Sequence, residues 1–165
     1  EEMWSGEGRK YTIIRPSNPV GKHQLQSLGA HGVVTTVYAK VKNSELIEIF
    51  GDGNTIRDFF LVSDLTKLIH RVLESNHKNN CIINASSGIG HSINEIVKIC
   101  SEFFNVEPDL VHHRDREPII KKNVLCNQLA REKFNWKPIQ NIYKIIEALD
   151  CEVRQGEVLW QEKKT

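Results

Sequence analysis

Short apolar, β-branched runs alternate with segments of helical periodicity along this 165-residue chain, and this alternation constrains the fold more than any other feature. Tyr11–Ile14 and Cys81–Asn84 have the length and composition of buried parallel strands. Leu46–Phe50 and Phe59–Val62 are further short strand candidates. Because apolar residues recur every three or four positions between these runs, the sequence predicts the α/β class, with an incomplete parallel sheet.

The expected helices are defined by their apolar faces. These faces are Val33, Val34, Val37, Tyr38 and Val41, then Leu65, Leu68, Ile69, Val72 and Leu73, then Ile93, Ile96, Val97, Cys100, Phe103 and Phe104, with further helices at 128–134 and 141–149 and a strand at 110–112. Pro16 and Pro19 are expected to stop the first strand. Ser63 is expected to cap the second helix, and Ser92 with Glu95 matches a capping box for the third.

Composition excludes several classes of protein. With 39% hydrophobic and 26% charged residues the chain is globular, and its net charge of +1 indicates no nucleic-acid or membrane partner. No apolar run is long enough to cross a bilayer, and no signal-like leader is seen, so a cytoplasmic location is expected. Cys81, Cys100, Cys126 and Cys151 form no C-x-x-C pair, which favours reduced core cysteines.

Three segments carry recognisable motifs: Ile14–Gly21 (I-R-P-S-N-P-V-G), Ile49–Asp64 (I-F-G-D-G-N-T-I-R-D-F-F-L-V-S-D) and Phe134–Pro138 (F-N-W-K-P). They resemble the R-P-x-N-x-x-G, G-D-G-x-x-x-R-D-F-x-x-V-x-D and L-G-W-x-P signatures of the NAD-dependent nucleotide-sugar epimerases and dehydratases. These are extended short-chain dehydrogenases, with UDP-galactose 4-epimerase as the familiar member. The resemblance runs from about Glu1 to Leu149. It implies part of a Rossmann-type fold with a small α/β substrate-binding subdomain.

Other signatures of that family are not found. There is no G-x-x-G-x-x-G turn, and no Tyr-x-x-x-Lys pair stands upstream of the strand at Tyr11. Glu1 or Glu2 matches a glutamate that often follows the catalytic lysine. The resemblance therefore implies that residues 1–165 are the C-terminal, substrate-binding portion, without the dinucleotide-binding portion. NAD would belong to the intact enzyme, and this chain alone would bind no cofactor and be inactive.

The resemblance also implies site residues. The substrate-binding residues would be Asn18, Val33, Glu48, Phe50, Arg57 and Arg116, with Pro16 and Ser17 beside the nicotinamide of the cofactor. The two arginines suit a diphosphate because a guanidinium donates two parallel hydrogen bonds. Asn18 would also face the diphosphate, although between two prolines it could simply be a turn residue. The helix starting near Val33 would point its N-terminus at the phosphates, and Glu48 and Phe50 would line a uracil pocket.

Alternative interpretations stay open for the arginines. Arg57 and Asp58 could form a surface ion pair. Arg116 could be a solvated loop residue, and Arg114 is a second match to the family's arginine. Ile119 stands where the family has an aspartate that often binds the ribose hydroxyls.

The expected function is binding of a UDP-sugar or another nucleotide sugar by the substrate-binding half of an NAD-dependent 4-epimerase in polysaccharide sugar synthesis. A 4,6-dehydratase or a reductase is the alternative within the family. A non-catalytic remnant or assembly module, which forms homo-oligomers through exposed sheet edges, is the alternative outside it. No catalytic residue is assigned. No metal site is expected at His112–His113, because neighbouring strand residues point to opposite faces.

Overall fold

The computed structural model describes residues 10–25, 32–75, 80–115 and 118–162, and strands and helices alternate along them. The strands are β1 (Thr12–Pro16), β2 (Asn18–Val20), β3 (Ile47–Phe50), β4 (Ile56–Leu61), β5 (Cys81–Ala85), β6 (Gly90–Ser92), β7 (Leu110–His113) and β8 (Lys122–Asn123). The helices are the short 3₁₀ turn η1 (Lys22–Leu25), α2 (Val33–Lys42), α3 (Val62–Glu74), α4 (Ile93–Phe104), α5 (Gln128–Phe134) and α6 (Ile142–Glu162). The α/β class is confirmed.

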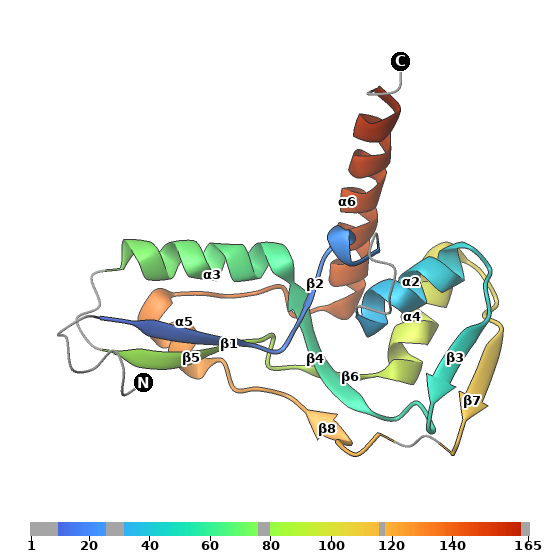
Figure 1. The fold of residues 1–165 in the computed structure, drawn as a ribbon, viewed down its shortest axis with the longest axis horizontal. Coiled ribbons are helices and arrows are strands. Elements are labelled where there is room, and N and C mark those ends of the chain that lie inside the picture. The colour runs from blue at the N-terminus through green and yellow to red at the C-terminus, as the bar shows by residue number, and fades with distance from the viewer. Residues whose placement is uncertain (1–9, 26–31, 76–79, 116–117, 163–165) are drawn as a thin grey trace.

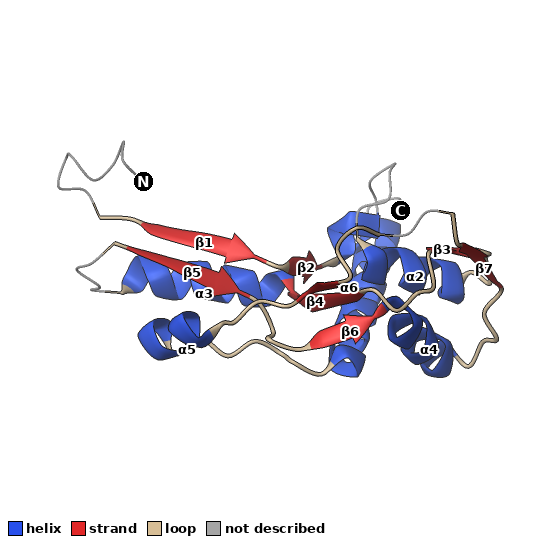
Figure 2. Ribbon diagram, turned by 90° about the horizontal axis from the view of Figure 1, so that it is seen from below, coloured by secondary structure: helices blue, strands red, loops and turns tan. Residues whose placement is uncertain are grey.

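The strands form small, mainly parallel sheets. β1 pairs with β5 in parallel, from Thr12 opposite Cys81 to Pro16 opposite Ala85. β2 and β8 run parallel to β4, β6 is antiparallel to it, and β3 pairs in parallel with β7. Figures 1 and 2 show an elongated molecule, with β1, β5, α3 and α5 at one end and α2, α4, β3 and β7 at the other.

Two clusters of buried side chains form the core of the molecule, one at each end. The larger cluster joins α2, α4, α6 and β3 and contains Val34, Val37, Tyr38, Val41, Ile47, Ile49, Ile96, Val97, Cys100, Ile145, Ile146 and Leu149. The second joins β5, α3 and α5 and contains Phe60, Leu68, Ile83, Ala85, Ala130, Phe134 and Trp136. Trp136, from the F-N-W-K-P motif, donates its indole N–H to the Asp64 carbonyl at 2.8 Å. This motif therefore fastens the chain to the start of α3.

The expectation that prolines stop the first strand is confirmed at Pro16 and wrong at Pro19. Pro16 is the last residue of β1 and Pro19 lies inside β2. Ser17 donates its backbone N–H to the Ala85 carbonyl at 2.9 Å. Because alternate residues of a parallel strand bond the same neighbour, the backbone nitrogen of Pro16 points away from β5. Because β1 pairs only with β5 among the described strands, the missing N–H of Pro16 costs no ladder bond.

The start of α3 also differs from the expectation. The helix begins at Val62, and its cap residue Leu61 makes no side-chain capping bond, so Ser63 is not the cap. Of the expected apolar face, Leu68 is fully buried, whereas Ile69 is 43% and Leu73 79% exposed. The helix lies over the narrow β1–β5 pair, which covers less of its surface than a full sheet would.

The capping box is half confirmed. Ser92 Oγ accepts the backbone N–H of Glu95 at 3.1 Å, as predicted. The Glu95 carboxylate turns instead to His91, whose Nδ1 lies 2.8 Å away.

All four cysteines are free, as expected, but only Cys100 is buried and Cys126 and Cys151 are exposed.

Candidate functional site

A cavity of about 300 Å³ opens between the N-terminal half of α2 and strands β3 and β4. It is lined by Gly32, Val33, Thr36, Val37, Lys40, Ile47, Glu48, Ile49, Phe50, Thr55, Arg57, Ile93 and Pro118. Val33, Glu48, Phe50 and Arg57 are four of the six substrate-binding residues that the sequence predicts. The tertiary structure therefore brings together residues from three separate elements.

The start of α2 forms one wall of this cavity. Gly32 has a φ of +111°, a conformation that side-chain-bearing residues rarely adopt. A Cβ there would lie 3.0 Å from Thr35 Oγ1 and 3.2 Å from the Gln24 amide. The first helical bond runs from Thr36 N–H to the Gly32 carbonyl at 3.0 Å. The N–H groups of this first turn and the helix dipole therefore favour an anion beside Val33.

Strand β3 forms the opposite wall. The backbone N–H groups of Ile47 and Gly51 donate to Asp109 and His113, at 2.9 and 3.0 Å. Since alternate residues of a parallel strand bond the same neighbour, the backbone N–H and C=O of Glu48 point to the edge opposite β7. The Phe50 side chain is 49% exposed, and its ring centroid lies 5.6 Å from that of His113. An apolar ring and a strand edge thus border the same cavity.

Arg57 lines the cavity with a positively charged side chain, as does Lys40. Its Nη1 donates to the Ile56 carbonyl and its Nη2 to the Ile120 carbonyl, both at 2.9 Å. These bonds hold the half-buried guanidinium beside Pro118 at the cavity wall. A guanidinium carries five N–H groups, so further donors remain for an anionic ligand.

Asp58 takes no part in a surface ion pair with Arg57, and that alternative is wrong. The Asp58 carboxylate is fully buried. It accepts hydrogen bonds from Ser87 N–H at 2.8 Å, Ser87 Oγ at 2.7 Å and Gly88 N–H at 3.0 Å. The carboxylate therefore organises the loop after β5.

Three predicted residues lie outside the cavity wall. Asn18 is part of β2 rather than a turn, and its Nδ2 donates to the Asp58 carbonyl at 2.8 Å. Pro16 ends β1, and the Ser17 hydroxyl lies 3.4 Å from Asp58 Oδ1. All three lie at or directly after the carboxyl end of the parallel strand β1, where open α/β sheets place their ligands. The roles of Asn18, Pro16 and Ser17 stay predictions.

The second predicted arginine, Arg116, lies outside the described residues, as do Glu1 and Glu2. The alternative Arg114 is exposed and does not line the cavity. Ile119 is 99% exposed.

Cavity residues on α2 and just before β4 were not predicted from the sequence. Thr36 and Lys40 follow Val33 at positions i+3 and i+7, a helical spacing that could have identified them. Lys40 Nζ donates to the Leu46 carbonyl at 2.9 Å, which ties α2 to the start of β3. Thr55 lies just before β4, and only the tertiary structure places it on the cavity wall with Arg57.

One Tyr-x-x-x-Lys spacing does occur, at Tyr38 and Lys42 on α2, downstream of the first strand. Tyr38 is 1% exposed and its hydroxyl donates to Asp150 Oδ1 at 2.7 Å. A hydroxyl buried and bonded in this way cannot exchange a proton with a ligand in the cavity.

The described residues do not fit the pyrophosphate of NAD. Gly88 and Gly90 follow the buried strand β5, but the chain continues into β6 rather than into a helix. The N–H groups of Ser87 and Gly88 already donate to Asp58. A dinucleotide turn would instead present such groups, at the start of a helix, to the phosphates.

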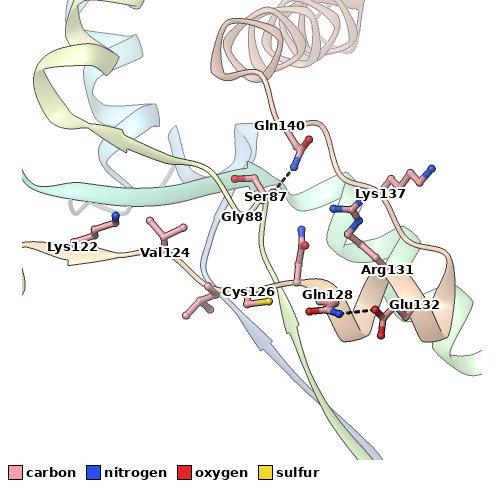
Figure 3. A pocket seen from close by; sticks show the side chains of 12 residues that line it. Ser87, Gly88, Lys122, Val124, Cys126, Gln128, Arg131, Glu132, Lys137 and Gln140 are labelled. Atoms are coloured by element: carbon pink, nitrogen blue, oxygen red, sulfur yellow. Dashed lines mark hydrogen bonds between the residues drawn. The ribbon is translucent and has the colours of Figure 1, made fainter.

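A larger, open cavity of about 880 Å³ lies on the other side of β4 (Figure 3). Lys122 lies at one end of it, and Arg131 and Lys137 lie at the other. Gln140 donates to the Ser87 carbonyl and Gln128 to Glu132, at 2.8 and 2.7 Å. None of the predicted site residues that the structure describes lines this second cavity.

Over the described ranges, no three His, Cys, Asp or Glu side chains gather as metal ligands. His112 Nδ1 lies 3.1 Å from the Gly51 carbonyl, whereas His113 Nε2 lies 3.1 Å from Glu48 Oε1. The two histidines thus have separate partners. A search of the described helices found none with the length and apolar character needed to cross a membrane.

Comparisons with known proteins identify the family of the chain. A family model described as the NAD dependent epimerase/dehydratase family matches residues 1–86. A putative UDP-glucose 4-epimerase of Methanocaldococcus jannaschii is 32% identical over 131 residues, which are 79% of this chain and 41% of that protein. A GDP-6-deoxy-D-talose 4-dehydrogenase of Aggregatibacter actinomycetemcomitans is 31% identical over 57% of this chain and 30% of that protein.

A solved structure agrees over most of the fold. The UDP-glucose 4-epimerase of Thermotoga maritima, crystallised with UDP-glucose, superimposes with a TM-score of 0.83 at 27% identity. The match covers 94% of this chain and 50% of that one. The present chain therefore spans about half the length of the solved relative, and less of the curated ones.

Proposed function

The chain belongs to the NAD-dependent epimerase/dehydratase family, and from this premise we propose that it is the substrate-binding portion of a nucleotide-sugar 4-epimerase acting on a UDP-sugar. The observation that carries the proposal is the convergence of Arg57, Phe50 and the start of α2 on one cavity. The dinucleotide-binding portion, which would hold NAD, is proposed to be a separate part of the enzyme.

The diphosphate would lie between Arg57 and the first turn of α2. Arg57 supplies a full positive charge, and the N–H groups after Gly32 supply donors along the helix dipole. The guanidinium and the helix start face the same cavity. A diphosphate there would accept hydrogen bonds from N–H groups that otherwise bond to water.

The uracil would lie along β3. Its N3–H can donate to the Glu48 carbonyl, which points to the strand edge opposite β7, and its ring can stack on the exposed Phe50 side chain. The cavity volume of about 300 Å³ is at the lower end of the range for small-molecule sites, which suits the nucleotide rather than the whole sugar nucleotide.

This chain's contribution to catalysis would be orientation. Contacts to the nucleotide, remote from the reacting carbon of the sugar, would hold that carbon in place for groups outside this chain. Tyr38 is bonded to Asp150 and cannot serve as the acid or base, so the chain alone is expected to be inactive. NAD supplies hydride transfer in this family when it is bound.

The convergent cavity favours this proposal over an assembly module that merely kept the fold. Among the described residues Arg57 faces the same space as Phe50 and Val33, whereas an assembly module requires no such convergence. The four free cysteines support the proposed cytoplasmic location, because thiols persist in reducing compartments.

Calorimetric titration of UDP into the folded chain tests the proposal. We expect saturable binding that Arg57→Ala weakens at least tenfold, whereas Arg131→Ala, a cation of the larger cavity, leaves the affinity unchanged. GDP and NAD are the comparison ligands, and UDP is expected to bind more tightly than either. A folded chain that binds no UDP, or binds it equally well without Arg57, would overturn the proposal.

A further inference from the structure

His91 on β6 is a buried side chain with one nitrogen unaccounted for. It is 9% exposed, and its Nδ1 lies 2.8 Å from Glu95 Oε1 on α4. Its Nε2 is buried and has no hydrogen-bond partner within the part of the chain that the structure describes. Buried polar atoms without a partner are rare in folded proteins, and each calls for a physical explanation.

His91 is the register partner of Arg57. β4 and β6 run antiparallel, with Arg57 directly opposite His91, so both side chains project from the same face of the sheet. Thr55 and Ile93, two positions along from Arg57 and His91 respectively, line the proposed nucleotide cavity. Arg57 itself lines this cavity, so the sheet face that Arg57 and His91 share is the one that borders it, and Figure 2 shows β6 beside β4.

The Glu95 contact determines which nitrogen of His91 carries the proton. An ionised carboxylate only accepts hydrogen bonds, so Nδ1 of His91 must be the donor to Glu95. In the neutral ring Nε2 then has no hydrogen and presents a lone pair. A buried acceptor thus lies across from Arg57, a side chain that only donates.

We propose that His91 is a positioning residue for Arg57. When Arg57 turns from the Ile120 carbonyl toward a bound diphosphate, its guanidinium donates one N–H to His91 Nε2 and its remaining N–H groups to phosphate oxygens. Glu95 holds the imidazole ring in the required tautomer, as a carboxylate does for other functional histidines. This inference rests on the proposed function, in which Arg57 binds the diphosphate.

Nitrogen-15 NMR of the histidine rings, with and without UDP, tests the inference on the unmodified chain. Free His91 is expected to show the tautomer protonated at Nδ1, and UDP is expected to shift its Nε2 resonance toward the hydrogen-bonded range. The same shift should be absent in Arg57→Lys, which lacks the planar fork of donors. A ring protonated at Nε2, or an Nε2 resonance that bound UDP leaves unchanged, would overturn the inference.

Affinity measurements give a second, independent arm. His91→Phe fills the ring volume without an acceptor and is expected to weaken UDP binding about tenfold, whereas His91→Gln, which keeps an acceptor, recovers part of that loss. Equal affinities for the Phe and Gln variants would count against a positioning role. Failure of the proposed function looks different, because the unmodified chain would then bind no UDP at all.

Discussion

Arg57 and Asp58 are adjacent on β4, yet their side chains lie on opposite faces of the strand. Arg57 reaches the cavity beside α2 and β3, while the fully buried Asp58 accepts three bonds of 3.0 Å or less from the loop after β5. Successive strand residues alternate in direction, so one dipeptide serves two purposes. The arginine lines a cavity, and the aspartate holds the loop after β5.

Asp58→Ala should destabilise the fold much more than Arg57→Ala. Removing the carboxylate leaves the buried N–H of Ser87 and the partly buried N–H of Gly88 without an acceptor, at a cost of about 3 kcal/mol in the free energy of unfolding. Arg57 is half-buried and, among the described residues, bonds two carbonyls, so its loss should cost about 1 kcal/mol. Urea unfolding of both variants measures the difference, and similar midpoints would contradict this assignment.

Gly32→Ala should impair both folding and UDP binding. A side chain is strained at a φ of +111° and would come within 3.0 Å of Thr35, so we expect a loss of about 1–3 kcal/mol in stability. Displacement of the first turn of α2 should also weaken UDP binding. Asn43→Ala, at the far end of α2, is the control, because the side-chain bond that Asn43 makes among the described residues goes to the exposed Glu45. A Gly32→Ala protein with unchanged UDP affinity would show that the helix start does not bind the phosphates.

Phe50→Ala should weaken binding of UDP with little effect on stability. The Phe50 side chain is 49% exposed, so little packing is lost, whereas stacking of a base on an aromatic ring is worth about 1–3 kcal/mol. Inorganic pyrophosphate lacks a base, and its binding should be unaffected by the substitution. Calorimetry with both ligands checks this, and equal losses for the two would place the base elsewhere.

Trp136→Phe should lower stability by about 1–3 kcal/mol. The indole is 1% exposed, packs at 90° against Phe60, and donates to the buried Asp64 carbonyl at 2.8 Å. The smaller ring leaves that carbonyl without this donor and opens a cavity. Denaturant unfolding followed by circular dichroism measures the effect. Tyr143→Phe, at a position 46% exposed, is the control that should change stability little.

Cys100 should resist alkylation while the protein is folded. Burial raises the pKa of the Cys100 thiol from 9.0 to about 12, so the reactive thiolate is scarce at pH 8. The folded state therefore prefers the protonated thiol, and this preference begins to cost stability only as the pH rises above about 9. Mass spectrometry after iodoacetamide treatment at pH 8 should find Cys126 and Cys151 modified first. Equally fast modification of Cys100 would contradict its burial.

Local sequence patterns predicted most of the elements. The β-branched runs at Tyr11–Ile14 and Cys81–Asn84 became β1 and β5, and the periodic segment from Val33 became α2, because strand and helix periodicity depend on neighbouring residues alone. Ser92 was found as a cap for the same reason. The motif around Arg57 likewise predicted the family, since its residues are contiguous in the chain.

The sequence by itself determined the α/β class, the family and the identity of Arg57 and Phe50 as candidate ligands of a nucleotide. Only the tertiary structure decided that Arg57 and Asp58 face opposite ways into different surroundings, and that Glu95 leaves its capping role for His91. It alone decided that Tyr38 is bonded to Asp150, 112 positions away. Such contacts join residues far apart in the chain, and their geometry depends on how whole elements pack, which no local pattern of residues encodes.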